Sequence, residues 1–577
     1  MNSAVVILVA AVIYVAMYFT YGKSLQNKVV RADPNRPTPA HKLYDGVDYV
    51  PAHPLVLYGH HFASIAGAGP IVGPAVAMAW GWLPGLIWVW FGNVFIGAVH
   101  DYLALMSSVR YDGKSVQWIA GKLMSKRTGI AFELYIWFAL LLVVAAFTSV
   151  IAGIYTGTPE AATASILFLV SAVIVGYLMY KTSLHFAGAT VVGLILVALS
   201  VWLGFKFPIH ATYHQWALFL LVYIIIAASL PVWVLLQPRD YLNAYVLWFG
   251  LILGGLAFIL IGSKGTFTAP AYTTWSANVV GGKPSPFWPT IPLVIACGAL
   301  SGFHSIVGSG TSSKQLDNEI HGLLVGYGGM FTEGFLSTIV IASIAVYGIK
   351  VFADAGIDIN ASNWAAIYAP KVANEIGKVG IFSKSYAYGL TNAFGIDYKF
   401  GVVFASLWVS AFALTSLDTA TRLGRFAWQE VFGMVVDTSE GIWKAVTNRW
   451  VASAIIAALG VLLAWGNQWL ILWPAFSGMN QMLASIAMMT GALWVTKIQQ
   501  AGKWSWAVLI PALFLWITVT LALAWFLVVV VPGIGDAFTK YSVGLITLVG
   551  LLLNFLLAID FWAAWKKPAE EYEAAKA

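Results

Sequence analysis

Long apolar runs constrain this chain more than any other feature. Residues 134–154 form one such run, which contains no charged side chain and is mostly apolar on every side of a helix. A membrane-spanning helix needs about 20 predominantly apolar residues, whereas a barrel strand needs only about 10 of alternating polarity. The run therefore predicts a spanning helix, and its recurrence predicts an all-α polytopic membrane protein.

The composition excludes several other classes of protein. Of 577 residues, 60% are hydrophobic and 10% are charged, against about 45–50% and about 25% in soluble domains. The net charge of +7 does not indicate a nucleic-acid partner, because the basic residues lie in short breaks between apolar runs, as in cytoplasmic membrane loops. The single cysteine, Cys297, excludes an intrachain disulfide and a Cys-rich metal site.

About fifteen segments are long and apolar enough to cross a membrane. Their approximate limits are 4–20, 55–79, 84–109, 133–155, 161–180, 186–204, 215–236, 241–262, 287–308, 322–349, 401–421, 450–466, 468–496, 504–531 and 541–563. If the connections alternate between two sides, 22 of the 31 Lys and Arg residues fall on one side. Because cytoplasmic loops are enriched in Lys and Arg, we predict an outside N-terminus and a cytoplasmic C-terminus.

These segments divide the chain into six regions. We expect an N-terminal transmembrane helix (1–21), a cytoplasmic loop (22–54), a first part of the membrane core (55–349), an extracytoplasmic loop with short amphipathic helices (350–400), a second part of the core (401–563) and a cytoplasmic tail (564–577). No GxxxxGK[ST] sequence occurs. If the chain moves a solute, a gradient must therefore drive it.

Two glycine-rich stretches interrupt the apolar segments. Residues 59–74 hold four glycines and two prolines. Freed backbone groups are tolerated at membrane depth only where they face protein or water, so a broken helix is expected. Its half-helix termini would bind an anion or a cation. The candidate substrate-binding residues here are His60, His61, Ser64, Gly67 and Gly69. The alternative is a kinked helix whose small residues allow close packing.

The second stretch, residues 301–317, loses its apolar character in a run of Gly, Ser and Thr. Its hydroxyls and freed amides could replace the hydration shell of a carboxylate. The candidate substrate-binding residues are His304, Ser305, Ser309, Gly310, Thr311 and Ser312. We predict that residues 64–70 and 302–311 are non-helical and face one central cavity. The alternative is a cytoplasmic loop that begins at Gly308.

Ionisable residues inside the apolar segments are candidates for ion coupling. They are His100, Asp101 and Glu333. Each is costly in a membrane unless it is paired or lines a cavity. His100 and Asp101 are adjacent, so on a helix they point about 100° apart and need not touch. The alternatives are that Asp101 caps its helix with Arg110, and that Glu333 is permanently protonated and hydrogen-bonds two helices.

Asp418 and Arg422 end another apolar segment. They are four residues apart, a spacing that allows an ion pair on a helix. Together with Lys314 they are candidates for a cytoplasmic gate, or Arg422 binds a substrate carboxylate. The amides of Asn480 and Gln481 are expected mainly to join helices, with substrate contact as the alternative.

The apolar segments contain four histidines that are candidates for a metal site, His60, His61, His100 and His304. Adjacent histidines diverge on a helix, and no HExxH motif occurs. We therefore expect no metal, no cofactor and no enzymatic activity.

Five motifs give the chain a specific resemblance. They are GHHFASIAGAGPIVGP, GAVHDYLAL, SGFHSIVGSGTSSKQL, FALTSLDTATRLGR and WPAFSGMNQMLA, and they lie in order across residues 55–490. With them the chain resembles the carbon starvation protein A family of inner-membrane proteins. The resemblance implies a role in the starvation response and gradient-driven uptake of peptides or pyruvate. It also implies a LeuT-like core of five-plus-five inverted repeats, although the two broken segments here are seven apart, so extra helices are needed.

The expected function is a symporter that imports small carboxylate nutrients, peptides or pyruvate, with H⁺ or Na⁺. Its other partner is membrane lipid, and its oligomeric state stays open. Two alternatives remain at this point. One is a membrane metalloenzyme or redox protein that uses the histidines, and the other is a sensor that binds a nutrient without moving it.

Overall fold

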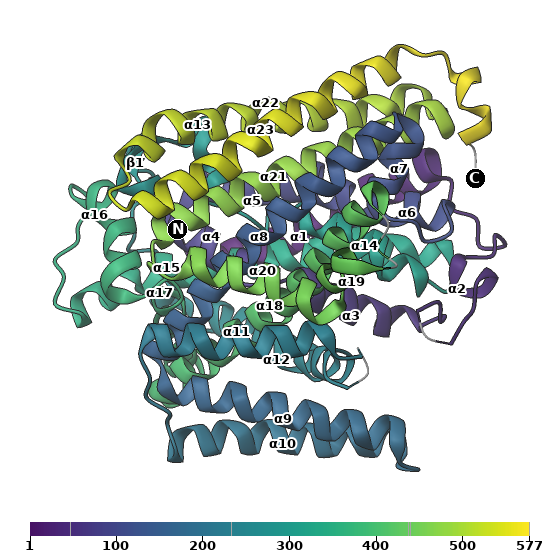
Figure 1. The fold of residues 1–577 in the computed structure, drawn as a ribbon. Helices are drawn as coiled ribbons and strands as arrows, with labels where there is room; N and C mark the ends of the chain where they lie inside the picture. Colours follow the sequence, from purple (N-terminus) through teal and green to yellow (C-terminus); the bar gives the residue numbers. More distant parts are fainter. Residues whose placement is uncertain (47, 232–233, 437, 439, 576–577) are drawn as a thin grey trace.

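The computed structural model describes residues 1–46, 48–231, 234–436, 438 and 440–575. Long helices run roughly side by side through a single bundle (Figure 1). Met1 lies at one end of these helices, together with α16 and β1, and the C-terminus lies at the other end. We call these ends the N-terminal face and the C-terminal face.

Helices make up most of the structure. In the first half they are α1 (Ser3–Met17), α2 (Pro39–Lys42), α3 (Pro54–Ile65), α4 (Gly69–Ala77), α5 (Trp82–Gly92), α6 (Ala98–Arg110), α7 (Val116–Leu123), α8 (Lys126–Gly157), α9 (Pro159–Lys181), α10 (Phe186–Lys206), α11 (Tyr213–Ser229) and α12 (Leu236–Leu260). In the second half they are α13 (Phe287–Thr290), α14 (Phe303–Gly310), α15 (Gly329–Asp354), α16 (Trp364–Lys371), α17 (Gly380–Phe394), α18 (Tyr398–Val435), α19 (Gly441–Val446), α20 (Arg449–Ala464), α21 (Trp469–Leu493), α22 (Trp506–Trp525) and α23 (Ala537–Lys566). A short antiparallel pair, β1 (Ser276–Asn278) and β2 (Pro284–Pro286), lies on the N-terminal face.

The prediction of an all-α, multi-pass membrane protein is confirmed. Among the described residues, ten helices are long and apolar enough to span a membrane, or eleven if the bent pair α3 and α4 counts as one. The count of about fifteen stays a prediction, because α11 and α20 are apolar but shorter. The first spanning helix is longer than expected, since α1 continues through π-helical turns to Val30.

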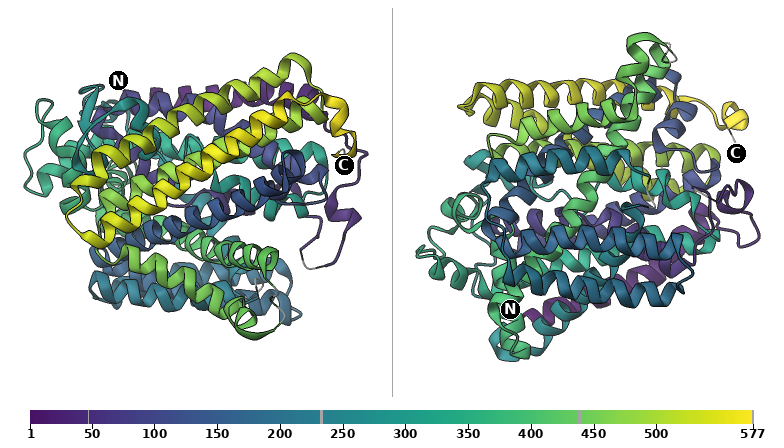
Figure 2. Two further views of the ribbon diagram at one scale, coloured as in Figure 1. Left: turned by 45° about the horizontal axis from the view of Figure 1, so that its top comes forward. Right: turned by 60° about the horizontal axis from the view of Figure 1, so that its bottom comes forward.

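Peripheral helix pairs flank the core of the bundle. Helices α9 and α10 pack as an antiparallel pair at one edge, and α22 and α23 lie along another edge (Figure 2). Helices α3, α4, α6, α14, α15 and α21 contact one another in the interior. The interior is therefore where the two glycine-rich stretches meet.

The first of these stretches is broken as predicted, but over fewer residues. Helix α3 ends at Ile65 and α4 begins at Gly69, so that Ala66, Gly67 and Ala68 are non-helical. The two helices are bent by 50°. Residues 66–68 are called the first break below.

The second stretch is broken in a different place from the one predicted. Residues 303–310 form α14, and the irregular backbone precedes it at 294–302, which we call the second break. Gly298 has a φ of +83° there, a conformation that favours glycine. The prediction of a non-helical 302–311 is therefore wrong. One reason is that the Ser309 hydroxyl donates to the carbonyl of Ser305 at 2.6 Å, a bond compatible with helix.

Candidate functional site

The two breaks face one small cavity in the interior. It is lined by Ile65, Gly67, Val143, Phe147, Cys297, Ser301, Phe303, Ser416, Phe476 and Asn480. Its volume is about 10 Å³, which is room for about one water molecule. Of the two stretches predicted to face a common cavity, Ile65 and Gly67 from the first and Phe303 from the second line it, together with Cys297 and Ser301 of the second break. We call this space the central cavity.

Glycines allow the backbones of the breaks to approach their neighbours. A Cβ at Gly67 would lie 2.4 Å from Oγ of Ser416 on α18, and a Cβ at Gly69 would lie 2.6 Å from Sγ of Cys297. Real Cβ contacts are essentially never that short. Both predicted glycines therefore allow close approach of the backbone. A larger residue at either position would have to displace Ser416 or Cys297.

Helix α21 satisfies the backbone of the second break. Oδ1 of Asn480 accepts from the amide of Phe303 at 2.9 Å, and its Nδ2 donates to the carbonyl of Ala296 at 3.0 Å. Nε2 of Gln481 donates to the carbonyl of Leu300 at 2.7 Å. These amides were expected mainly to join helices, with substrate contact as the alternative. They instead replace the hydrogen bonds that the unwound segment has lost, which lipid could not supply.

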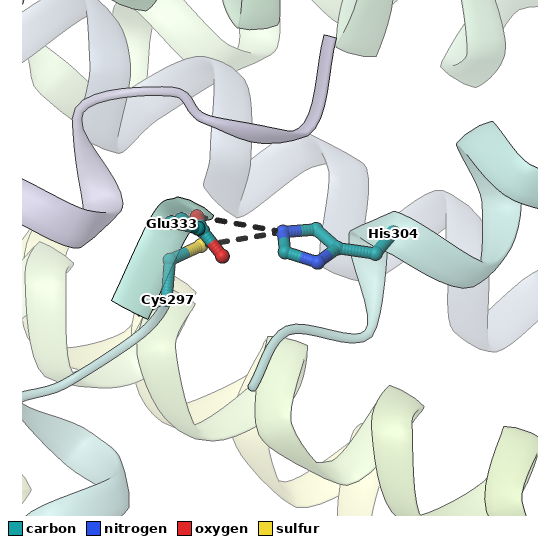
Figure 3. A group of neighbouring side chains, drawn as sticks. All are labelled: Cys297, His304 and Glu333. Carbon is teal, nitrogen blue, oxygen red and sulfur yellow. Dashed lines mark hydrogen bonds and ion pairs between the residues drawn. The ribbon is translucent and has the colours of Figure 1, made fainter. Parts of the chain in front are cut away.

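A fully buried cluster of ionisable side chains lies beside the second break. Asp101 on α6 has Oδ1 2.8 Å from Nδ1 of His100 and Oδ2 2.8 Å from Nδ1 of His304. The other nitrogen of His304, Nε2, lies 3.7 Å from Oε1 of Glu333 on α15 and 4.0 Å from Sγ of Cys297 (Figure 3). The predicted residues thus form one group, which we call the buried cluster.

The structure decides two points that the sequence left open for this cluster. His100 and Asp101 do touch, because Nδ1 lies close to the backbone end of the imidazole and can reach the next residue. Asp101 does not cap α6 with Arg110, whose Nε instead lies 2.7 Å from Oε1 of Glu319. Asp101 is therefore committed to the two histidines.

Glu333 has an unusual environment. Its side chain is 0% exposed, and neither carboxyl oxygen has a hydrogen-bond partner among the described residues. A buried carboxylate without compensation is strongly disfavoured. The alternative of a glutamic acid that hydrogen-bonds two helices does not fit these contacts. The carboxyl group avoids that cost if it is neutral or if it faces an imidazolium.

Part of the same cluster has donor atoms of the kind that bind metals. Among the described residues, the donor atoms of Cys297, His304 and Glu333 all lie within 4.8 Å of one another, so they could hold an ion. However, His304 has a carboxylate facing each ring nitrogen. That arrangement stabilises an imidazolium, which has no lone pair for a metal. We therefore propose no metal here, and ion coupling stays the prediction for this cluster.

The remaining predicted binding residues are separated by the fold. Nδ1 of His61 lies 2.7 Å from Oγ of Ser312, whereas His60 points into a different groove that Gly59 and Tyr241 also line. The hydroxyls of Ser64 and Ser309 donate to carbonyls of their own helices, and that of Ser305 donates to the carbonyl of Gly302. Thr311 is exposed, and a Cβ on Gly310 would meet nothing within 4 Å. None of these residues lines the central cavity.

The expected ion pair of Asp418 and Arg422 is not formed. Asp418 instead pairs with Arg239 of α12 and accepts from the hydroxyl of Tyr223 at 2.9 Å. Arg422 donates to the carbonyls of Ala227 and Leu230, at 2.9 and 2.7 Å. These carbonyls lie at the end of α11, where the helix leaves its last carbonyls unpaired.

Lys314 is remote from that network. Its Nζ lies 5.5 Å from the ring centroid of Tyr49. The structure therefore does not bring together the three residues that were expected to form one gate.

Sequence reasoning missed several residues of these sites. Arg239 was assigned to a short loop, although an adjacent Arg and Asp between two apolar runs signal a buried network. Ser416 and Ser301 line the central cavity, but serines are common in helix packing and carry no signal of their own. Cys297 was considered only for disulfide and metal chemistry.

Comparisons with known proteins agree on one family. The family model described as "Carbon starvation protein CstA" matches residues 2–522. Over its whole length the chain is 32% identical to the "Peptide transporter CstA" of Bacillus subtilis, covering 99% of that protein. It is 33% identical to the Escherichia coli protein of the same name, over 91% of this chain and 81% of that one.

A relative with a different printed name is also similar. The "Pyruvate/proton symporter BtsT" of Escherichia coli is 30% identical, over 90% of this chain and 81% of that protein. The matched ranges include the residues of the two breaks and of the buried cluster. The chain therefore belongs to the carbon starvation protein CstA family.

Proposed function

We propose that the protein is a secondary active transporter that imports small carboxylate nutrients, peptides or pyruvate, together with protons. The names of its relatives, peptide transporters and a pyruvate/proton symporter, support this function. We further propose that it resides in the plasma membrane with its N-terminus outside, as the distribution of Lys and Arg predicts.

The observation that carries the proposal is the position of His304 between two buried carboxylates. Asp101 faces one ring nitrogen and Glu333 faces the other. A proton on this group can be held as an imidazolium beside Asp101 or on the Glu333 carboxyl. The pair therefore offers two buried protonation states, which a proton-coupled carrier needs on opposite sides of its cycle.

The cluster is in contact with the second break, which links protonation to the substrate. Cys297 belongs both to the wall of the central cavity and to the surroundings of His304. Protonation of Glu333 changes the charge beside Cys297 and hence the free energy of a carboxylate in the cavity. Proton and anion would therefore bind together, as symport requires.

We place the substrate in an enlarged form of the central cavity. About 10 Å³ admits roughly one water molecule, so pyruvate enters only when the walls separate. The N-termini of α4 and α14 border the breaks. Helix N-termini present N–H groups and a positive dipole end, which stabilise a carboxylate. Closed walls around a small cavity fit an intermediate of alternating access.

Uptake by purified protein in sealed liposomes tests this function. An inward proton gradient should drive accumulation of pyruvate or of the dipeptide alanyl-alanine above equilibrium, and an inward sodium gradient at equal pH should not. Accumulation only under the sodium gradient would show that the coupling ion is Na⁺ and not H⁺. Binding without uptake would favour the sensor, and chemical conversion of the probe would favour the enzyme.

A further inference from the structure

A second polar cavity lies on the N-terminal face, beyond the central cavity. Its volume is about 390 Å³, far more than the central cavity has. Its polar lining includes Thr156, Thr158, Lys378, Lys384, Ser406 and Asn467. The ends of α8, α11, α17 and α18 surround it. We call it the outer pocket.

Lys378 is a buried cation in the wall of this pocket. It lies between the π-helical turn at 372–376 and α17, and it is 8% exposed. Its Nζ donates to Oγ of Ser149 at 2.7 Å and to Oδ1 of Asn467 at 3.2 Å. Both partners are neutral. Burial lowers the pKa of Lys378 to about 7.

Lys378 has no carboxylate partner in the part of the chain that the structure describes. Among the described residues, no Asp or Glu forms an ion pair with Lys378, and Glu375, which also lines the pocket, pairs with Lys371. A buried charge without a counter-charge is costly, and an anion bound in the pocket would supply the missing charge. The chemistry of the pocket therefore suits an anion.

The outer pocket and the central cavity are neighbours along α8. Phe147 lines the central cavity, Val150 lines the outer pocket, and Ser149 between them holds Lys378. The two spaces are thus separated by about one helical turn. Lys378 stands at their junction.

A column of aromatic rings along α21 connects Lys378 with the central cavity. Nζ of Lys378 lies 5.6 Å from the ring centroid of Trp469, and Trp469 lies 5.6 Å from Trp473. Trp473 lies 5.3 Å from Phe476, and Phe476 lies 5.6 Å from Phe147. Both phenylalanines line the central cavity. The column forms an apolar wall that starts at the cation and ends at the cavity.

We propose that the outer pocket is a second binding site for the carboxylate of the substrate, in which the ligand pairs with Lys378 before it passes to the central cavity. The inference rests on the proposed function, because it takes a small carboxylate as the transported solute. The carboxylate displaces Asn467 from Nζ and supplies the counter-charge. The organic part of the ligand then lies toward Trp469 and the aromatic column.

The first test is uptake kinetics in liposomes with pyruvate, or with alanyl-alanine if pyruvate is not transported. Lys378→Met should raise KM about tenfold or more, because a charge-assisted hydrogen bond is lost, while Lys378→Arg should keep KM close to the wild type. Lys371→Met removes an exposed lysine nearby and serves as the matched control. An unchanged KM in Lys378→Met would overturn the outer site.

A second test uses the wild-type protein and does not depend on the folding of a variant. A buried amine that is partly neutral reacts with acetic anhydride, and mass spectrometry follows each lysine separately. The transported probe in excess should slow acetylation of Lys378 but not that of Lys371. Equal rates at Lys378 with and without probe would overturn the proposal.

The two proposals fail in different ways. If the wild-type protein transports neither probe, the proposed function is contradicted. The assignment of a substrate carboxylate to Lys378 is then contradicted as well. Wild-type protein that transports one probe, with no effect of Lys378→Met on KM, contradicts only the outer site.

Discussion

Asp101 and His304 are 203 residues apart in sequence, and their side chains lie 2.8 Å apart in the interior of the bundle. This contact joins α6 to the helix that follows the second break. It also orients the imidazole, since Nδ1 is held by Asp101 and Nε2 is left facing Glu333. Every function proposed for the cluster depends on this orientation.

Glu333→Gln should uncouple transport. The amide keeps the shape of the side chain but cannot exchange a proton, so the accumulation ratio under a proton gradient should fall to about one. With equal pyruvate concentrations on both sides of the membrane, the rate of pyruvate exchange should stay within a few-fold of the wild-type rate. Liposome accumulation and counterflow measure the two properties. Gradient-driven accumulation that persists in Glu333→Gln, with its pH dependence intact, would contradict the coupling role.

Gly67→Leu should abolish uptake without preventing membrane insertion. The added side chain would collide with Ser416, which already lies 2.4 Å from an ideal Cβ. Gly310→Ala is the matched control, since its Cβ would meet nothing within 4 Å. Uptake rates are to be normalised to the amount of monodisperse protein. Normal uptake by Gly67→Leu would show that the first break does not border the substrate path.

Removing Arg239 alone should destabilise the protein by about 3–5 kcal/mol, because it leaves buried carboxylates without their cation. The affected groups are Asp418 and Asp240. The double variant Arg239→Met/Asp418→Asn should recover a large part of the loss, since the most buried charge is then also removed. Thermal unfolding in detergent measures both. Equal stability of Arg239→Met and the wild type would disprove a structural role for this network.

Stability should depend on pH through Lys378. Its pKa is about 7 in the folded protein and 10.5 in the absence of burial. Between these values the unfolded chain binds more protons, so stability rises with pH by up to about 1.4 kcal/mol per unit. The other charged groups of the pocket are Lys384 and Glu375.

Thermal unfolding at about pH 7.5 and about pH 9 measures this rise, where the linkage is largest. Lys371→Met should keep it and Lys378→Met should lose most of it. An equal rise in Lys378→Met would assign the effect to other groups.

Orientation can be tested with cysteines in a Cys297→Ser background. Asn27, Lys126 and Asp358 are exposed. An impermeant thiol reagent added to intact cells should label Asp358→Cys but neither Asn27→Cys nor Lys126→Cys, unless the cells are first opened. The reverse pattern would place the N-terminus inside.

The sequence was informative where physics limits the alternatives. Apolar runs permit little besides spanning helices, and clustered Gly and Pro around residue 67 permit little besides a break at membrane depth. Asp101 and Glu333 stood out because ionisable residues are costly there. Their common position with His304 in the fold could not be foreseen, because it depends on tertiary packing.

The second break illustrates what local pattern cannot decide. The run of Gly, Ser and Thr at 302–311 looked unwound, but serine hydroxyls bonding to carbonyls are compatible with α14. The apolar residues 294–300 looked helical, yet they are irregular because Asn480 and Gln481 supply their hydrogen bonds. Partners almost 200 residues away decided the local structure. Likewise, Asp418 pairs with Arg239 and not with Arg422, which lies one helical turn away.

The amides of α21 also restrict how the central cavity can open. Asn480 and Gln481 hold the second break by several hydrogen bonds, and the amide of Gly302 donates to the carbonyl of Asn480 at 3.1 Å. Pulling α21 from this segment would expose backbone groups that lipid cannot solvate. We therefore expect the two to move together when the cavity opens. We expect the opening movement on the opposite wall, where Gly67 packs closely against Ser416 and no hydrogen bond joins them, so that the helices around the first break would be the moving element.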